Sequence, residues 1–526
     1  VREFYNVDEI AAFDNGSAGY DYIDNIFRKC GIEHIHEVSV SGGENKTQYL
    51  ISGRYSSNEG IVETSFNKKV NYRVKIDSDI RPWLKTGVNL WGEYTTSKGP
   101  RFSQYRGVLI ESLIFPNTVS PRDETGKYNN LDLLGSAQYN PMGHIWEQDK
   151  DDYSYRSRLQ GYVDLKLLPG LSLRINQSFN FGSSLYRSTF NEDSYETWAG
   201  TSLTSARAQN SQSYSWINSN ILSYIKEINR NHRLNATFVF EQSRSDDFVN
   251  TSSATGLASI AIGADNTSLG KVTGGESSRI KTAMMSALAR VNYVFMNRYM
   301  LTASYRWDGS SRLAYNKRWD SFPSLALAWD IKQENFMEGL PFDQLKVRLG
   351  YGQTGNQAVA AYSAFNEYTA SRNADNDLVI SLKRIGNPDL GWERTEQYNV
   401  GLDFGFFNNR LAFNVDLYHK LSKDVLININ VPLHTGQETK LANIARILNK
   451  GIEVTVNATP VANKNVMWNS VLTLSHNQGT FEKFSDGTDM ITPSGGYEND
   501  YFRYIKGKRV GTIWGYFYDG IWKTAE

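Results

Sequence analysis

The residues best suited to binding chemistry are aromatic side chains in polar segments that we predict to be loops. Flat aromatic rings present an apolar face with a polar edge, so they can stack on sugars while neighbouring amides and carboxylates bond sugar hydroxyls. The segments at about 95–155, 182–212 and 354–396 mix Tyr and Trp with Asn, Asp and Arg. The candidate ligand-binding residues are Trp146, Tyr153, Tyr155, Tyr195, Trp198, Tyr362 and Tyr368. The alternative for each is packing within a loop or in an aromatic girdle.

Two groups of residues have side chains that can bind metal ions. His34 and His36 are two residues apart, so they would share one face of a strand. Asp149, Asp151 and Asp152 could bind calcium, although they lack the spacing of an EF-hand loop. We favour a lumen-facing or interfacial histidine pair and a solvated acidic loop, and therefore predict no metal and no cofactor.

Two further motifs resemble parts of catalytic sites. The segment Asp308-Gly-Ser-Ser311 offers a serine, but it lacks the G-x-S-x-G elbow and an assignable His and Asp. The segment Gly350-Tyr-Gly-Gln-Thr-Gly355 lacks the Lys-Ser/Thr pair and the helix of a phosphate-binding loop. We interpret the first as a turn at a strand end and expect no enzyme activity.

β-Strands must position these residues, because the clearest pattern in the chain is alternation with a period of two. In Val70–Ile80 the odd positions are Asn, Arg, Lys, Asp and Asp, and the even positions are almost all apolar. The same alternation recurs at 171–176, 299–308, 398–406, 411–418 and 452–457. The longest segments have roughly the 9–11 residues of a tilted membrane strand. Their charged face suits a wall that meets water or another polar surface and does not suit a dry core.

Composition narrows the class of protein. The chain contains no run of 18 apolar residues and its mean hydropathy is −0.49, which excludes membrane-spanning helices but not a membrane β-barrel. The 56 basic residues balance the 56 acidic ones, so nothing indicates nucleic-acid binding. Short turns such as Met296-Asn297-Arg298 alternate with long polar segments. Strand alternation alone would also fit a soluble sandwich or propeller.

A set of short motifs, in this order, resembles the SusC/RagA family of TonB-dependent outer-membrane transporters. The motifs are Val38-Ser-Val-Ser-Gly-Gly43, Thr47-Gln-Tyr-Leu-Ile-Ser-Gly53, Arg290-Val-Asn-Tyr293, Tyr299-Met-Leu-Thr-Ala-Ser-Tyr-Arg306, Asp308-Gly-Ser-Ser-Arg312, Leu345-Lys-Val-Arg-Leu-Gly-Tyr-Gly352, Thr354-Gly-Asn-Gln357, Asn387-Pro-Asp-Leu-Gly-Trp-Glu393, Asn399-Val-Gly-Leu-Asp403 and Asn449-Lys-Gly-Ile-Glu453. Each motif is weak alone, whereas the ordered set over about residues 20–520 is specific. We interpret Trp392 and Glu393 as structural: a turn that leads into a strand.

The resemblance implies an all-β fold, a large antiparallel transmembrane β-barrel with short periplasmic turns and long extracellular loops. The full barrel would have about 22 strands. We expect residues 1–526 to be a partial barrel domain that starts with an early loop or hairpin region at 1–33. We expect roughly 14 to 18 of its strands here, with the plug domain and the closing strands encoded elsewhere.

The resemblance also implies a function in the cell outer membrane. We expect TonB-dependent import of glycans or oligosaccharides, less often peptides, together with a SusD-like surface lipoprotein. The TonB complex would act through an N-terminal region outside this sequence. The alternatives are a passive, porin-like channel and a surface protein that binds or degrades glycans.

Overall fold

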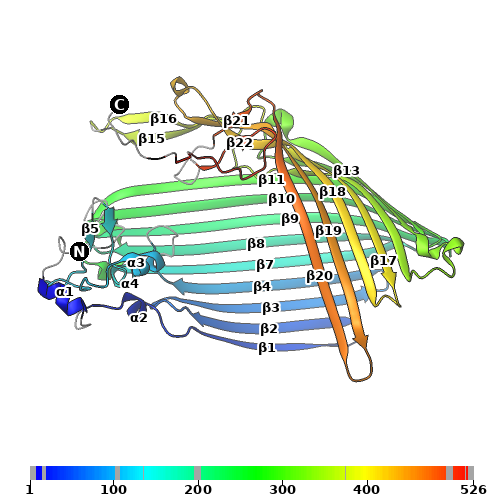
Figure 1. Ribbon diagram of the computed structural model, residues 1–526, viewed down its shortest axis with the longest axis horizontal. Helices are drawn as coiled ribbons and strands as arrows, with labels where there is room; N and C mark the ends of the chain where they lie inside the picture. The colour runs from blue at the N-terminus through cyan, green and yellow to red at the C-terminus, as the bar shows by residue number, and fades with distance from the viewer. Residues whose placement is uncertain are drawn as a thin grey trace. The chain divides into compact units, whose positions relative to one another are not determined.

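The computed structural model consists mainly of long antiparallel β-strands (Figure 1). It describes residues 7–14, 19–44, 46–100, 107–133, 136–192, 194, 203–373, 375–492, 501–515, 517–518 and 520. Within these residues, no helix has both the length and the apolar character needed to cross a membrane.

Among the described residues, sixteen strands form one sheet, and their order in the sheet is their order in the chain. They are β1 (Ile32–Glu44), β2 (Thr47–Glu59), β3 (Phe66–Arg81), β4 (Leu84–Lys98), β7 (Gln148–Leu168), β8 (Leu171–Phe190), β9 (Ser205–Asn229), β10 (His232–Thr255), β11 (Lys271–Phe295), β12 (Tyr299–Ser310), β13 (Trp319–Asp330), β14 (Gln344–Asn356), β17 (Glu393–Phe406), β18 (Leu411–Asn430), β19 (Thr439–Ala462) and β20 (Met467–Phe484). The number lies within the range expected from the sequence.

Smaller elements fill the longer connections. Three two-stranded sheets pair β5 (Leu131–Leu133) with β6 (Ser136–Gln138), β15 (Glu367–Arg372) with β16 (Leu378–Arg384), and β21 (Met490–Ile491) with β22 (Tyr504–Ile505). The helices are α1 (Val7–Asp14), α2 (Tyr22–Ile26), α3 (Val108–Ile114) and α4 (Gly143–Trp146). The 3-10 turns of the described segments are η1 (Ile260–Ile262), η2 (Thr267–Leu269), η3 (Tyr315–Lys317), η4 (Ile331–Gln333), η5 (Asn335–Met337) and η6 (Leu433–Thr435).

The chain divides into two compact units, and each is described by itself. The first unit comprises Val1–Val163, Asn176–Ile217 and Ser245–Lys281. The second comprises Asp164–Ile175, Asn218–Arg244 and Thr282–Glu526.

The predicted alternation is confirmed in β3 of the first unit. Val70, Ile76 and Ile80 lie on one face and are 45–47% exposed, whereas the intervening odd positions carry the charges. An apolar face left open along a whole strand is suited to contact with lipid, because a soluble protein would cover it.

The strands extend well beyond the predicted segments. β9 and β11 have 25 residues each and β7 has 21, about twice the length that crosses a hydrocarbon core. The extra residues come from polar stretches, for example Asp149–Ser154 at the start of β7. The long polar connections between these strands are therefore shorter than the sequence suggested.

Among the described residues, each unit has two small apolar cores. In the first unit, α2, α3 and α4 gather at one end of β1–β4 (Figure 1), where Tyr22, Ile26, Val108 and Ile145 are buried together. In the second unit, one buried core is made of Ile444, Ala445, Phe481, Phe484 and Ile491, and the second is made of Leu313, Ala314, Phe322, Val359, Ala364, Leu390 and Trp392.

The motif that ends at Trp392 and Glu393 belongs to the second core. Trp392 is 5% exposed, and its indole N–H donates a 2.8 Å hydrogen bond to the Arg318 carbonyl. Glu393 accepts from the Leu426 amide at 2.8 Å and from the Asn356 side chain at 2.7 Å. These contacts confirm the structural interpretation, because they fix a turn against two neighbouring strands.

Candidate functional site

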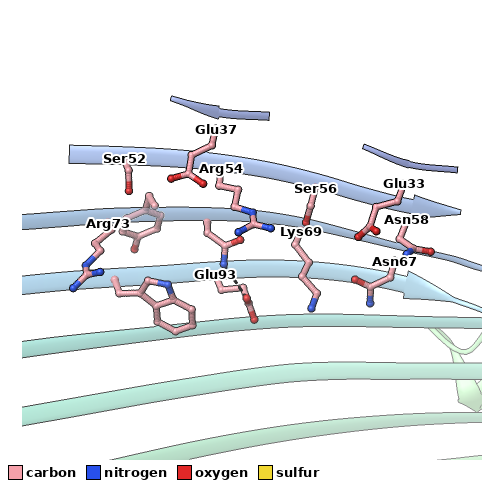
Figure 2. Close-up of a pocket in the computed structure, with 13 residues that line it drawn as sticks. Glu33, Glu37, Ser52, Arg54, Ser56, Asn58, Asn67, Lys69, Arg73 and Glu93 are labelled. Atoms are coloured by element: carbon pink, nitrogen blue, oxygen red, sulfur yellow. Dashed lines mark hydrogen bonds between the residues drawn. The ribbon is translucent and has the colours of Figure 1, made fainter. Parts of the chain in front are cut away.

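The polar face of β1–β4 in the first unit forms a hollow of about 600 Å³. The strand register sets Glu37, Arg54, Asn71 and Glu93 side by side across the four strands. Neighbouring cross-strand rows are also polar. Figure 2 shows the labelled side chains of these rows, such as Glu37, Arg54 and Glu93, projecting from one face of the strands. The lining residues are Glu33, Glu37, Ser52, Arg54, Ser56, Asn58, Asn67, Lys69, Asn71, Tyr72, Arg73, Trp91 and Glu93. We call this surface the open polar wall.

Most charges of the open polar wall are not neutralised by one another. Asn71 donates to Glu93 at 2.8 Å, and the Arg73 guanidinium donates to Asn89 at 3.0 Å. Within the described part of the chain, Glu37 and Arg54 face each other in register but form no ion pair. Such a surface needs water or a partner with complementary polar groups, because unpaired charges are costly to bury.

Two carboxylates of the open polar wall, those of Glu33 and Glu37, are widely spaced along one strand. Glu33 and Glu37 lie four residues apart on β1, and a strand rises about 3.4 Å per residue, so they are separated by about 13 Å. Glycoside hydrolysis uses two carboxyl groups about 5–9.5 Å apart. The backbone spacing of Glu33 and Glu37 therefore does not favour a hydrolytic pair.

At the turn end of the same face, the charges are paired. Asp77 forms a 2.7 Å ion pair with Lys75 and accepts a 2.7 Å hydrogen bond from the Tyr162 hydroxyl. The Tyr162 ring lies over Gly87, where a Cβ would come within 2.3 Å of it. A residue without a side chain is thus required for the ring to reach the carboxylate.

The polar face of β14, β17 and β18 in the second unit holds its charges in a network around Arg348. The guanidinium donates to Asp403 at 2.8 and 2.9 Å and to Asp416 at 2.9 and 3.1 Å. Asn414 donates to Asp403 at 2.9 Å, and Asp403 is only 6% exposed. Arg348 reaches both carboxylates by crossing Gly401, where a Cβ would lie 2.6 Å from the guanidinium carbon. We call this cluster the closed polar wall.

Two of the predicted ligand-binding residues lie in a strand, so their assignment to a loop was wrong. Tyr153 and Tyr155 belong to β7. The Tyr153 hydroxyl accepts from Arg187 at 3.2 Å, and the Tyr155 hydroxyl lies 3.0 Å from that of Tyr72. The segment was mistaken for a loop because polar residues occupy both of its faces.

The other predicted residues lie in connections or outside the described residues. Trp146 ends the short helix α4 and is 49% exposed. Tyr362 lies in a turn with a φ of 64°, and Tyr368 lies in β15 and is 60% exposed. Tyr195 and Trp198 lie outside the described residues. A ligand-binding role for all seven residues stays a prediction.

The candidate metal groups are placed as follows. His34 and His36 share one face of β1 with ring centroids 5.3 Å apart. Asp149 forms an ion pair with Lys98, and Asp151 forms one with Arg187 at 3.3 Å. Among the described residues, no cluster of three or more potential metal ligands occurs. The sequence prediction of no cofactor stays a prediction.

The two segments that resemble parts of catalytic sites, Asp308–Ser311 and Gly350–Gly355, occupy structural positions in the fold. Asp308 is 4% exposed and accepts from Arg306 at 2.8 Å. Gly350–Gly355 lies inside strand β14, and a Cβ at Gly355 would come within 2.2 Å of the Phe322 ring. The first position agrees with the interpretation as a turn at a strand end, and the second shows a strand in place of the helix that a phosphate-binding loop would need.

Sequence reasoning missed the closed polar wall. It placed Asp403 and Asp416 on polar strand faces, and Arg348 was noticed only within a motif. The signal available in the sequence was Gly401, a glycine on a polar strand face between Asn399 and Asp403. A gap of that kind leaves room for a long side chain from the next strand.

Comparison with known proteins gives a consistent result. Residues 102–524 match the family model described as TonB dependent receptor-like, beta-barrel. The chain is 29% identical to TonB-dependent receptor P26 of Formosa agariphila over 507 residues, 93% of this chain and 50% of the relative. It is 26% identical to TonB-dependent receptor SusC of Bacteroides thetaiotaomicron, which covers 90% of this chain and 50% of the relative.

Among solved structures, the fold is similar to that of the RagAB peptide transporter. The TM-score is 0.79 at 24% identity, over 90% of this chain and 53% of that one. At this identity, the likeness concerns the fold alone. The chain spans about half the length of the curated relatives it matches.

Proposed function

The chain belongs to the TonB-dependent receptor-like β-barrel family, and on that premise we propose that it forms the wall of an energised nutrient importer of the SusC/RagA type. It is part of a transmembrane β-barrel of the cell outer membrane, with short periplasmic turns and longer extracellular connections. The whole receptor would import its substrate with energy supplied through TonB.

The open polar wall is the observation that carries this proposal. Glu37 and Arg54 face each other without an ion pair, and Val70 and Ile76 on the opposite side of the same strands are open to lipid. A passive pore also needs a polar lumen. We favour a plug domain as the occupant, because unpaired charges of both signs can bind a folded polar surface specifically.

We propose that the substrate is a glycan or oligosaccharide, with a peptide as the alternative. The exposed rings of Trp146 and Tyr368 in the extracellular connections support a sugar, because they offer flat apolar faces beside polar groups. RagAB is described as a peptide transporter, which keeps the peptide alternative open. A SusD-like surface lipoprotein would cover the extracellular side, and we expect no resident cofactor.

Growth of the native host on single nutrients tests the proposal. Deleting the full-length gene should abolish growth on one oligosaccharide class, and deleting TonB should have the same effect.

Trp146→Ala and Tyr368→Ala should each raise the substrate concentration needed for half-maximal uptake, whereas Tyr94→Ala on the apolar face should not. Uptake that persists without TonB would contradict an energised importer and favour a porin. Substrate cleavage by the purified receptor would contradict transport as its only role.

A further inference from the structure

The outer face of the second unit carries an apolar hollow beside its short turns. Its volume is about 560 Å³, within the size range of small-molecule sites. The lining is aromatic at the turns and aliphatic farther along the strands. It consists of His232, Tyr293, Phe295, Tyr299, Met300, Leu301, Leu327, Ala328, Trp329, Val347 and Leu349.

Hydrogen bonds hold the polar tips of the aromatic lining in place. The Tyr299 hydroxyl and the Trp329 indole N–H donate to the same oxygen of Glu334, at 2.7 and 3.0 Å. Arg298 donates to the other Glu334 oxygen at 2.9 Å. At the opposite edge, His232 Nδ1 lies 2.5 Å from the Tyr293 hydroxyl. The hollow is thus bounded by rings whose positions are fixed before anything binds.

The turns next to the hollow are basic. Segments 229–233, 295–299 and 330–336 contain four basic residues, Arg230, Arg233, Arg298 and Lys332, and two acidic ones, Asp330 and Glu334. The rest of the same β13–β14 connection differs, because segment 337–344, whose Phe342 packs on Phe406, and the turn 406–411 together contain two acidic residues and one basic residue. An excess of positive charge therefore coincides with the hollow.

We propose that this hollow binds one phospholipid of the periplasmic leaflet, with an acyl chain against Leu301 and Leu327 and its phosphate at the basic turns. The short turns of this barrel family face the periplasm, so the hollow opens into that leaflet. Surrounding acyl chains are as apolar as leucine, so the hydrophobic effect does not retain the lipid. Retention rests on close packing in the hollow and on charge-assisted hydrogen bonds to the phosphate.

The test counts the lipids that stay on the full-length receptor. The receptor is extracted in mild detergent and delipidated in steps, and bound lipids are identified by native mass spectrometry. Leu327→Trp fills the hollow and should lower phospholipid occupancy several-fold. Leu417→Trp is the matched control, because Leu417 lies in the same cross-strand row and is similarly exposed, 48% against 44%. It should retain the lipid as the wild type does.

Adding lipids back tests the headgroup. Phosphatidylglycerol should rebind more tightly to the delipidated wild type than to Arg298→Gln. Correct folding of each variant is checked by the heat-dependent shift of its gel band. Equal occupancy in Leu327→Trp and wild type would overturn the proposal, as would equal loss in both tryptophan variants. Retention of lipid A in place of a phospholipid, or of a second receptor copy, would also overturn it.

Discussion

The polar face of β1–β4 and the polar face of β14, β17 and β18 follow the same two-residue alternation. They differ in whether their charged side chains form ion pairs with one another. In the open polar wall, Glu37 and Arg54 stand opposite each other without an ion pair. In the closed polar wall, Arg348 is shared between two aspartates. Alternation therefore identifies which face is polar, whereas strand register decides whether its charges are satisfied within the wall.

This difference suggests that the closed polar wall contributes to stability and that the open polar wall contributes to binding. A paired cluster with a nearly buried member, such as Asp403, contributes to stability only while all its partners are present. Unpaired charges on an exposed face contribute little to stability, so they are free to interact with something outside the chain. We expect substitutions in the two walls to act on different properties of the receptor.

The largest effect is expected from Arg348→Met in the closed polar wall. This change leaves Asp403 nearly buried without its cation, which should cost about 3 kcal/mol of unfolding free energy. Urea unfolding of the full-length receptor in phospholipid vesicles measures it. Arg348→Lys keeps the charge but loses the two-pronged geometry, so its cost should be smaller. Equal stability of the Met variant and the wild type would refute the closed-wall interpretation.

A smaller effect is expected from Gly401→Ala, which adds one methyl group under the Arg348 guanidinium. Its Cβ would lie 2.6 Å from the guanidinium carbon, so the cluster must shift at a cost of about 1–2 kcal/mol. Gly53→Ala is the control, because none of the described residues comes within 4 Å of a Cβ there. The same unfolding assay should show a difference between the two variants. A cost at Gly53 as large as that at Gly401 would mean that steric crowding is not the cause.

A third polar cluster, around Glu334 in the β13–β14 connection, is expected to make stability depend on pH. Hydrogen bonds from the Tyr299 hydroxyl and the Trp329 indole hold the pKa of Glu334 below its ordinary value. A carboxylate with a lowered pKa stabilises the fold above the pKa of the unfolded chain, and this contribution disappears as the pH falls through the folded pKa. Glu334→Gln should therefore be less stable than wild type at pH 7, with a modest difference that shrinks at pH 3. A difference that grows in acid would contradict this assignment.

The sequence predicted the walls better than their internal bonds. Val70–Ile80 was assigned correctly because its two faces differ strongly in polarity, and Trp392 because its motif marks a turn. Tyr155 was assigned to a loop because segment 148–156 is polar on both faces, where the strand no longer needs a lipid-facing side. The partners Arg348 and Asp403 are 55 residues apart, and their contact depends on the register of two strands, which alternation does not specify.

The smallest effect on stability is expected in the open polar wall, and it tests what that wall contacts. Arg54→Cys should change the unfolding free energy by no more than about 0.5 kcal/mol, because Arg54 forms no ion pair with any of the described residues. Cys30, the single cysteine of the sequence, is first replaced by serine so that a water-soluble thiol reagent reports position 54 alone. In the full-length receptor, a plug against this wall should slow labelling of Cys at position 54, and removing the plug should restore fast labelling. Rapid labelling in both forms would mean that the wall faces water, and a stability loss near that of Arg348→Met would mean that Arg54 is paired within the barrel.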